Sequence, residues 1–194
     1  MKNIENLLSL FSKRRSIRQF NNEEIDEETF IELIEAATWA PNGCHAEPWF
    51  FYVIRDESKI QEMREAVIAT NPDSNFYKQY QTFHNARYVI SICIDMEKRW
   101  YHRALENSER GVEAIDNPDY FSVAAAAENL ILAAHAKNLG TCWIGVSEAF
   151  RAKLEEVIEV EDNHMLAINI AIGHYDEIPP NPGRKPAEDV LKFI

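Results

Sequence analysis

The stretch YFSVAAAAENLILAAHAKN, residues 120–138, sets the strongest constraint on how this chain folds. Small and apolar residues fill nearly every position, which predicts a helix over 120–138. A helix that is apolar all round must be buried, and its alanines let another helix approach closely. In a chain of 194 residues, this predicts a helix packed at an interface between two subunits. Leu139-Gly140 supplies the expected stop.

Shorter elements are expected on both sides of this helix. Apolar stripes at helical spacing predict further helices over 3–13, 27–39, 58–69 and 147–157. Runs of β-branched, aromatic and apolar residues predict strands over 49–55, 88–95 and 165–172. These elements alternate without a regular βαβ rhythm, so we expect an α+β fold, with the whole chain, 1–194, as one domain.

Two segments fit neither pattern. Residues 96–119 mix charged and aromatic side chains without clean periodicity, so they predict an irregular region. The tail holds four prolines between Pro179 and Pro186, which exclude an ordinary helix or a central strand there. We expect the tail to run extended over a surface, either of its own chain or of a partner chain.

Composition excludes several classes of protein. The chain has 32 Asp and Glu against 20 Lys and Arg, a net charge of -12, which argues against binding nucleic acid or an anionic membrane. Its three cysteines are far apart and form no CxxC pair, so a disulfide framework is not expected. The apolar stretch 123–136 is interrupted by polar residues and is shorter than the roughly 20 residues of a membrane span. No secretory signal pattern opens the sequence. We therefore expect a cytoplasmic protein with no nucleic-acid or membrane partner.

Several motifs with known chemistry are missing. The sequence contains no GxGxxG after a strand and no Walker A motif, which argues against a Rossmann site and a P-loop. It contains no GxSxG elbow of the usual hydrolases. The six histidines form no HExxH and no helical i, i+4 pair, so no metal site is expected.

A basic cluster stands out against this acidic background. In KRRSIRQF, residues 13–20, the cations Lys13, Arg14, Arg15 and Arg18 surround one serine. One interpretation is a solvated charge run at the C-terminal end of a helix, where cations are favourable. The other is a phosphate clamp, because a guanidinium matches phosphate bidentately and a hydroxyl adds a further bond.

Four segments in order favour the second interpretation. They are RRSIR (14–18), APNGCHAEPW (40–49), GTCWIG (140–145) and PGRKP (182–186). Together they resemble the FMN-dependent nitroreductase family, from about residue 10 to the C-terminus. The resemblance implies an α+β sandwich, in which helices flank a central mixed or antiparallel sheet. It also implies an extended C-terminal arm over 175–194 and an intimate homodimer with two FMN sites at its interface. NAD(P)H would be the hydride donor, bound without a Rossmann fold.

The resemblance also assigns roles at the phosphate end of FMN. Arg14 and Arg15 would hold the phosphate and ribityl chain, with Ser16 beside them, and Arg184 would supply a second phosphate cation. Arg18 would approach the pyrimidine edge of the flavin, where a fixed cation stabilises the negative charge of the reduced ring.

At the ring end, the resemblance points to Trp143, Ile144 and Gly145. The backbone N–H of Gly145 would face flavin N5, and glycine permits that close approach. We expect the side chains of Trp143, Ile144 and Trp49 to be core. No protein side chain is expected to act as a catalytic residue, since the cofactor carries the chemistry.

The chain departs from the family at two places. The family pattern A-P-S-x-x-N-x-Q-P-W, which begins at Ala40 here and reaches the flavin from the other subunit, keeps Pro41 but carries Asn42, His45 and Glu47 in place of Ser, Asn and Gln. We hypothesise that Glu47 lowers the FMN potential by like-charge repulsion, or pairs with Arg18 or His45; the alternative is that it faces solvent.

The second departure lies near the C-terminus. A lysine common in the family is replaced by Pro182. Either Lys185 substitutes for it, or Arg14, Arg15 and Arg184 hold the phosphate alone.

The implied function is electron transfer from NAD(P)H through FMN to a small acceptor, such as a nitroaromatic, quinone, enone or flavin, by a ping-pong mechanism. Residues 96–121 would cover the ring and select the acceptor through Trp100, Tyr101, His102 and Phe121, or would be merely flexible. The rivals are a flavin carrier or sensor without turnover, and a helical protein whose basic cluster binds an acidic partner.

Overall fold

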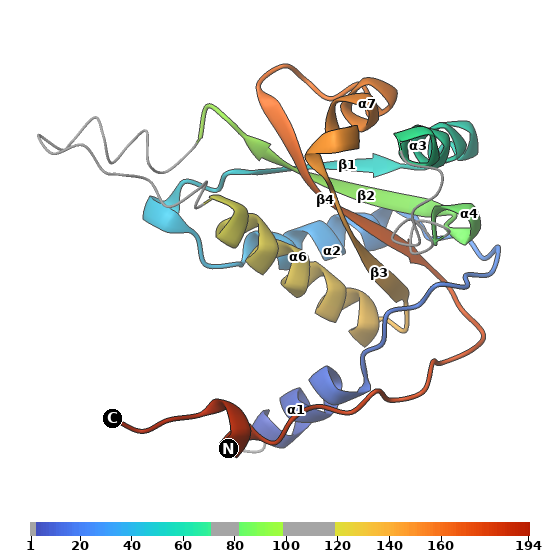
Figure 1. Ribbon diagram of the computed structural model, residues 1–194. Helices are drawn as coiled ribbons and strands as arrows, with labels where there is room; N and C mark the ends of the chain where they lie inside the picture. The colour runs from blue at the N-terminus through green and yellow to red at the C-terminus, as the bar shows by residue number, and fades with distance from the viewer. Residues whose placement is uncertain (1–2, 71–81, 99–118) are drawn as a thin grey trace, which may run out of the picture.

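The computed structural model describes residues 3–70, 82–98 and 119–194 (Figure 1). Its helices are α1 (Asn3–Lys13), α2 (Glu27–Thr38), α3 (Glu57–Thr70), α4 (Thr82–Asn85), α6 (Asp119–Ala136) and α7 (Glu148–Ile158). Short 3₁₀ turns are η1 (Gly43–His45) and η3 (Ala187–Val190). The strands are β1 (Trp49–Ile54), β2 (Tyr88–Asp95), β3 (Gly140–Gly145) and β4 (His164–Gly173).

The strands form one sheet in the order β1-β2-β4-β3, and every pairing is antiparallel. This confirms the α+β class and the predicted helices and strands, within one or two residues at each end. The prediction missed β3, which forms an edge of the sheet. A register shift between Ile92 and Cys93 marks a β-bulge where β2 pairs with β4.

Helices cover both faces of the sheet (Figure 1): α2 and α6 lie on one face, and α3 and α7 on the other. Side chains along β2 alternate between them, because successive residues of a strand point to opposite faces. Ile90 and Ile92 belong to the core beneath α2 and α6, whereas Val89 and Cys93 belong to the core beneath α3 and α7. All of β2 is buried, which confirms its predicted central place.

In the single chain, α6 is buried along one side only. Val123, Ala126 and Leu130 are fully buried against the sheet, while Phe121 is 69% exposed and Glu128 is exposed. One copy of the chain therefore leaves part of this helix uncovered. Burial of the remaining face at a subunit interface stays a prediction.

The chain ends leave two apolar surfaces uncovered. Helix α1 exposes Ile4, Leu7, Leu8 and Phe11. After β4 the chain runs as an extended arm with exposed Ile178, Val190, Leu191, Phe193 and Ile194. Figure 1 shows α1 and the end of this arm on the side of α6 that faces away from the sheet.

The cysteines and the helices also bear on the expectations from composition. All three cysteines are free, and burial raises the pKa of Cys93 to about 12, so its thiol stays protonated. Within 3–70, 82–98 and 119–194, no helix has both the length and the apolar character needed to cross a bilayer.

Candidate functional site

The basic segment 14–18 lies along the start of β3. Ser16 bridges Thr141 in parallel, and the Ile17 N–H donates to the Thr141 carbonyl at 2.9 Å. This approach requires glycine at position 140, because a Cβ there would come within 2.8 Å of Ile17 and of the Tyr175 ring. Two of the four motif segments are thus locked together by backbone contact.

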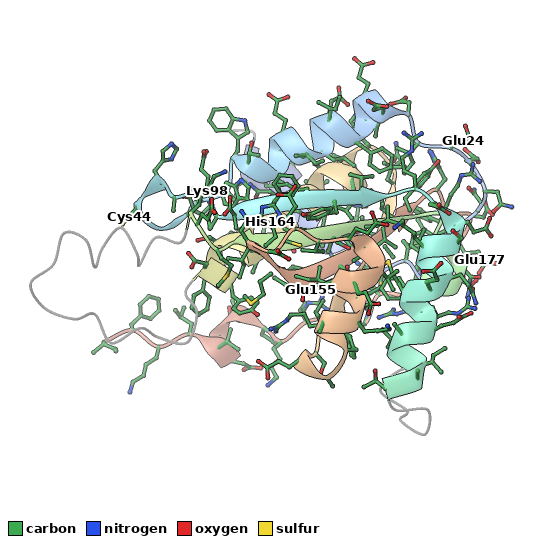
Figure 2. The ribbon with its side chains drawn as sticks, turned by 90° about the horizontal axis from the view of Figure 1, so that it is seen from above. Glu24, Cys44, Lys98, Glu155, His164 and Glu177 are labelled. Carbon is green, nitrogen blue, oxygen red and sulfur yellow. The ribbon has the colours of Figure 1, made fainter. Side chains whose placement is uncertain are left out.

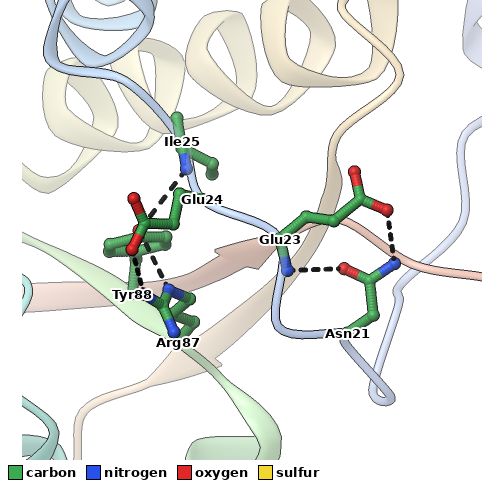
Figure 3. Close-up of polar contacts among 6 residues, drawn as sticks. All are labelled: Asn21, Glu23, Glu24, Ile25, Arg87 and Tyr88. Atoms are coloured by element: carbon green, nitrogen blue, oxygen red, sulfur yellow. Dashed lines mark hydrogen bonds and ion pairs between the residues drawn. The ribbon is translucent and has the colours of Figure 1, made fainter.

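The residues that follow the basic segment in the sequence, 21–25, are held by a polar network (Figure 3). Arg87 donates to Glu24 Oε1 at 2.6 Å and to the Tyr88 hydroxyl at 3.1 Å, and the Ile25 N–H donates to the same hydroxyl at 3.4 Å. Asn21 accepts the Glu23 N–H at 3.1 Å. These bonds fix the route from the basic segment to α2 against the start of β2.

The described part of the chain does not neutralise the cations of the segment. Arg15 Nη1 donates to the carbonyls of Ser12 at 2.6 Å and of Arg14 at 2.7 Å, while its Nε is buried and has no partner. Among the described residues, no carboxylate lies within 4 Å of Arg14, Arg15 or Arg18. A buried donor without a partner costs about 1–3 kcal/mol, so this site suits an anion.

His135, in the last turn of α6, reports the same positive potential. Burial lowers the pKa of His135, and the charges of Arg14, Arg15 and Lys13 lower it further. The sequence analysis did not single out this residue. The sequence could have indicated it, because His135 is a titratable residue in the last turn of a largely apolar helix, five residues before Gly140.

Strand β3 has one face beside this cluster that is open at Trp143 and Gly145 and covered at Thr141, which is 2% exposed. Thr141, Trp143 and Gly145 point to the same side because side chains alternate. Their neighbours Cys142 and Ile144 point into the core under α3 and α7. Ile144 is 1% exposed, as expected for core, but Trp143 is 40% exposed. The expectation that Trp143 is a core side chain is therefore wrong.

The ring end of the predicted site has room. A Cβ built on Gly145 would meet no atom of the described residues within 4 Å. Four residue steps lead from Thr141 to Gly145, which corresponds to about 13 Å along a strand. The described residues thus place an anion site at one end of this face and, at the other end, a glycine backbone that a flat ring can approach closely. Both features fit the phosphate and ring of FMN.

The segment 41–47 forms a second, separate surface. A groove of ≈ 650 Å³ is lined there by Glu35, Thr38, Trp39, Ala40, Pro41, Asn42, His45 and Glu47. Trp39 is 81% exposed, although the sequence analysis assigned it no role. Asn42 Oδ1 accepts the Glu47 N–H at 2.9 Å, and the Glu47 side chain is exposed. Of the alternatives for Glu47, the single chain shows the solvent-facing one.

One chain does not bring the two surfaces together. Figure 1 shows η1 beside the N-terminal end of α6, whereas Ile17 contacts Gly140, just after the C-terminal end of α6. Figure 2 likewise shows Cys44 on the opposite side of the molecule from Glu24. The intervening helix has 18 residues, or about 27 Å at 1.5 Å per residue.

The remaining predicted residues lie on the C-terminal arm, at the start of α6 or outside the described part. Arg184 and Lys185 are exposed on the arm, and the Arg184 side chain donates to the Gly183 carbonyl at 2.7 Å. Phe121 is exposed at the start of α6. Trp100, Tyr101 and His102 lie outside the described residues.

Known proteins resemble this chain over most of its length. A protein of Archaeoglobus fulgidus named NADH dehydrogenase/NAD(P)H nitroreductase is 27% identical over 176 residues, 88% of this chain and 86% of the relative. The FMN reductase (NADPH) of Bacillus subtilis is 27% identical over 189 residues, 94% of this chain and 70% of the relative.

A solved structure confirms the fold. A nitroreductase of Desulfovibrio desulfuricans in complex with FMN superimposes with a TM-score of 0.73, covering 95% of this chain and 94% of that one at 24% identity. The model of the nitroreductase family matches residues 11–174, a span that holds the basic segment, the loop 41–47 and β3. The chain therefore belongs to the nitroreductase family.

Proposed function

We propose that this chain is an NAD(P)H-dependent FMN oxidoreductase that works as a homodimer, with each site built from both copies. The observation that carries the proposal is the pairing of an unneutralised guanidinium cluster with the open face of β3. The family match and the two relatives support the same activity.

The chain's own residues divide the work of binding. Arg14, Arg15 and Ser16 hold the phosphate and ribityl chain, and Arg184 and Lys185 reach the phosphate from the arm. Bound FMN supplies the redox chemistry by taking a hydride from NAD(P)H and passing electrons to the acceptor. The backbone of Gly145 would approach the flavin ring near N5. Arg18 would lie at the pyrimidine edge, where its charge would favour the reduced ring.

The uncovered apolar surfaces support a homodimer. Leu7, Leu8 and Phe11 of α1 are 44%, 56% and 48% exposed, and fully burying one such side chain contributes about 1.5–3 kcal/mol. A second copy that covers α1 and the outer face of α6 also brings its own Pro41–Glu47 loop toward the ring. Two surfaces that lie beside opposite ends of α6 in one chain then meet across the interface.

One open face at the ring implies that donor and acceptor use it in turn. We propose a ping-pong mechanism in which NAD(P)H leaves before a small acceptor binds. The acceptor belongs to the nitroaromatics, quinones, enones or flavins. Residues 96–121, with Trp100, Tyr101, His102 and Phe121, cover the ring and select among them.

Anaerobic reduction tests the proposal. The purified protein should carry FMN, bleach with NADH or NADPH, and recover its colour on adding an acceptor. Arg15→Gln should lose most of its FMN. Arg55→Gln is the matched control, because Arg55 is paired with Glu27 at 3.6 Å and half exposed. A yellow protein that neither nucleotide bleaches is a carrier or sensor instead. A colourless monomer that refuses added FMN overturns the proposal.

A further inference from the structure

Arg151 on α7 carries a guanidinium with few partners. Its Nη2 donates to the Tyr120 hydroxyl at 3.2 Å, its Nη1 contacts Met165 Sδ at 3.7 Å, and its Nε is buried without a partner. Thioether sulfur is a weak acceptor, and a guanidinium has five N–H donors. Arg151 therefore keeps capacity for a stronger, negatively charged partner.

Several described arginines fall into two groups by their partners. Arg55 and Arg87 are paired with Glu27 and Glu24. No carboxylate lies within 4 Å of Arg151 among the described residues, and the same holds for the four arginines proposed to bind FMN. The chain has 32 carboxylates for 20 Lys and Arg, so a shortage of acids does not explain this. Leaving a half-buried cation unpaired costs free energy unless an outside anion completes it.

The position of Arg151 says where such an anion would lie. The Arg151 N–H donates to the Ser147 carbonyl at 3.0 Å, and Ser147 caps α7 two residues after Gly145. Tyr120, its hydroxyl partner, directly precedes the exposed Phe121. The guanidinium thus lies near the ring end of β3, away from the phosphate end that Arg14 and Arg15 occupy.

We propose that Arg151 determines acceptor specificity by binding a carboxylate on an aromatic electron acceptor. This inference rests on the proposed function and names the acceptor class as anionic. The net charge of -12 repels anions at long range. Screening limits that repulsion to about 8–10 Å in physiological salt. A cation near the ring can therefore attract an anionic acceptor at the site itself, although the whole protein repels anions at long range.

The test compares two acceptors that differ by one charge, 4-nitrobenzoate and 4-nitrobenzamide, on the FMN-loaded enzyme with NADH or NADPH. The wild type should prefer the benzoate in kcat/KM. Arg151→Gln should lower the benzoate-to-benzamide ratio by about 10-fold or more, as expected for a lost charge-assisted bond. Arg151→Lys should restore part of the ratio. Added salt should lower the wild-type ratio and leave that of Arg151→Gln flat, which a purely structural role would not produce.

Lys153→Gln is the matched control, since Lys153 lies on the same helix, is exposed, and pairs with Glu156 at 2.7 Å. It should keep the wild-type ratio. If Arg151→Gln does not fold, binding of the two compounds to the wild type tests the inference. In that case 4-nitrobenzoate should perturb the FMN absorption at a lower concentration than 4-nitrobenzamide. A wild type without preference for the anion, or a ratio unchanged in Arg151→Gln, overturns the inference alone. Failure of both nucleotides to reduce the flavin overturns the proposed function instead.

Discussion

Glu47 sits in a backbone that side chains rarely adopt. Its φ is 47°, and the loop neighbours Cys44 and His45 have φ of 52° and 51°. Such conformations cost about 1–3 kcal/mol each, so the loop must be held by its surroundings, and Asn42 supplies one bond to the Glu47 N–H. The geometry fixes the backbone of Glu47 on the surface that the proposed dimer turns toward the flavin.

Glu47→Gln should raise the midpoint potential of bound FMN. A unit charge about 8 Å from the ring, at an effective dielectric constant of about 40, contributes ~1 kcal/mol. For a two-electron couple this corresponds to roughly 20 mV. Redox titration against reference dyes measures the shift. Glu62→Gln, an exposed glutamate on α3, should leave the potential alone. An unchanged potential in Glu47→Gln would show that this carboxylate does not reach the flavin.

His135 should respond to phosphate binding. Burial and three neighbouring cations lower its pKa in the free protein, so the folded state binds this proton less readily than the unfolded chain. Neutral His135 therefore favours the folded state. This contribution to the free energy of unfolding is fully present above the unfolded pKa of about 6.5 and is lost as the pH falls through the folded pKa. A bound phosphate offsets the cations and should raise the pKa of His135.

NMR titration of the histidine ring with and without FMN measures this shift, and riboflavin serves as the control because it lacks the phosphate. His135→Gln should weaken the pH dependence of FMN affinity, leaving only the part that comes from ionisation of the FMN phosphate itself. Equal titration of His135 with FMN and with riboflavin would place the phosphate elsewhere.

At the scale of elements, strand β3 links the two ends of the proposed FMN site. Its two glycines are needed for different reasons, Gly140 for packing within the chain and Gly145 for the proposed cofactor. At Gly140 a Cβ would collide with Ile17 at 2.8 Å, whereas at Gly145 it would meet nothing. We expect Gly140→Ala to displace the basic segment, destabilise the fold by about 1–3 kcal/mol, and weaken FMN binding.

Gly145→Ala should keep the stability of the apo-protein and lose FMN affinity, because a Cβ there would meet no described atom within 4 Å but would lie where the ring is proposed to bind. Thermal unfolding of the apo-proteins and fluorescence titration with FMN separate the two effects. If Gly145→Ala destabilises the apo-protein as much as Gly140→Ala, the space beside Gly145 serves the fold and not a ligand.

The same strand shows how far sequence reasoning reaches. The segment GTCWIG was identified as part of the site from its motif, but not as a strand, because two glycines in six residues weaken the β signal. Once it is an edge strand, alternation puts Trp143 on the open face with Gly145. Runs such as YVISICID gave clear strand predictions because both faces of β2 are buried.

At the scale of the whole molecule, the uncovered apolar surfaces make a prediction about assembly. Leu8→Asp on α1 should raise the dimer dissociation constant at least about 10-fold, because it removes roughly 1.5–3 kcal/mol of burial and adds a charge. Analytical ultracentrifugation measures it. Ile68→Asp on α3, where Ile68 is 43% exposed, should leave the dimer intact. Equal effects of both variants would place the interface elsewhere.

The layout of the site was the part least available to sequence reasoning from residue patterns alone. Periodicity located helices and strands, and the motif order located candidate residues. Nothing in the local pattern says that the segment 14–18 and the loop 41–47 lie beside opposite ends of α6, since that depends on long-range pairing of the sheet. The apolar face of α6 was predicted, but one chain buries only the side against the sheet.

The separation of the two surfaces along α6 has a genetic consequence. A subunit damaged at Arg15 and a subunit damaged at Glu47 and Asn42 would each be inactive as pure assemblies. When mixed, the hybrid pairs one copy's sound guanidiniums with the other's sound loop, and so regains one working centre while its second centre carries both lesions. Co-expression of two defective alleles should therefore rescue activity that neither allele provides on its own.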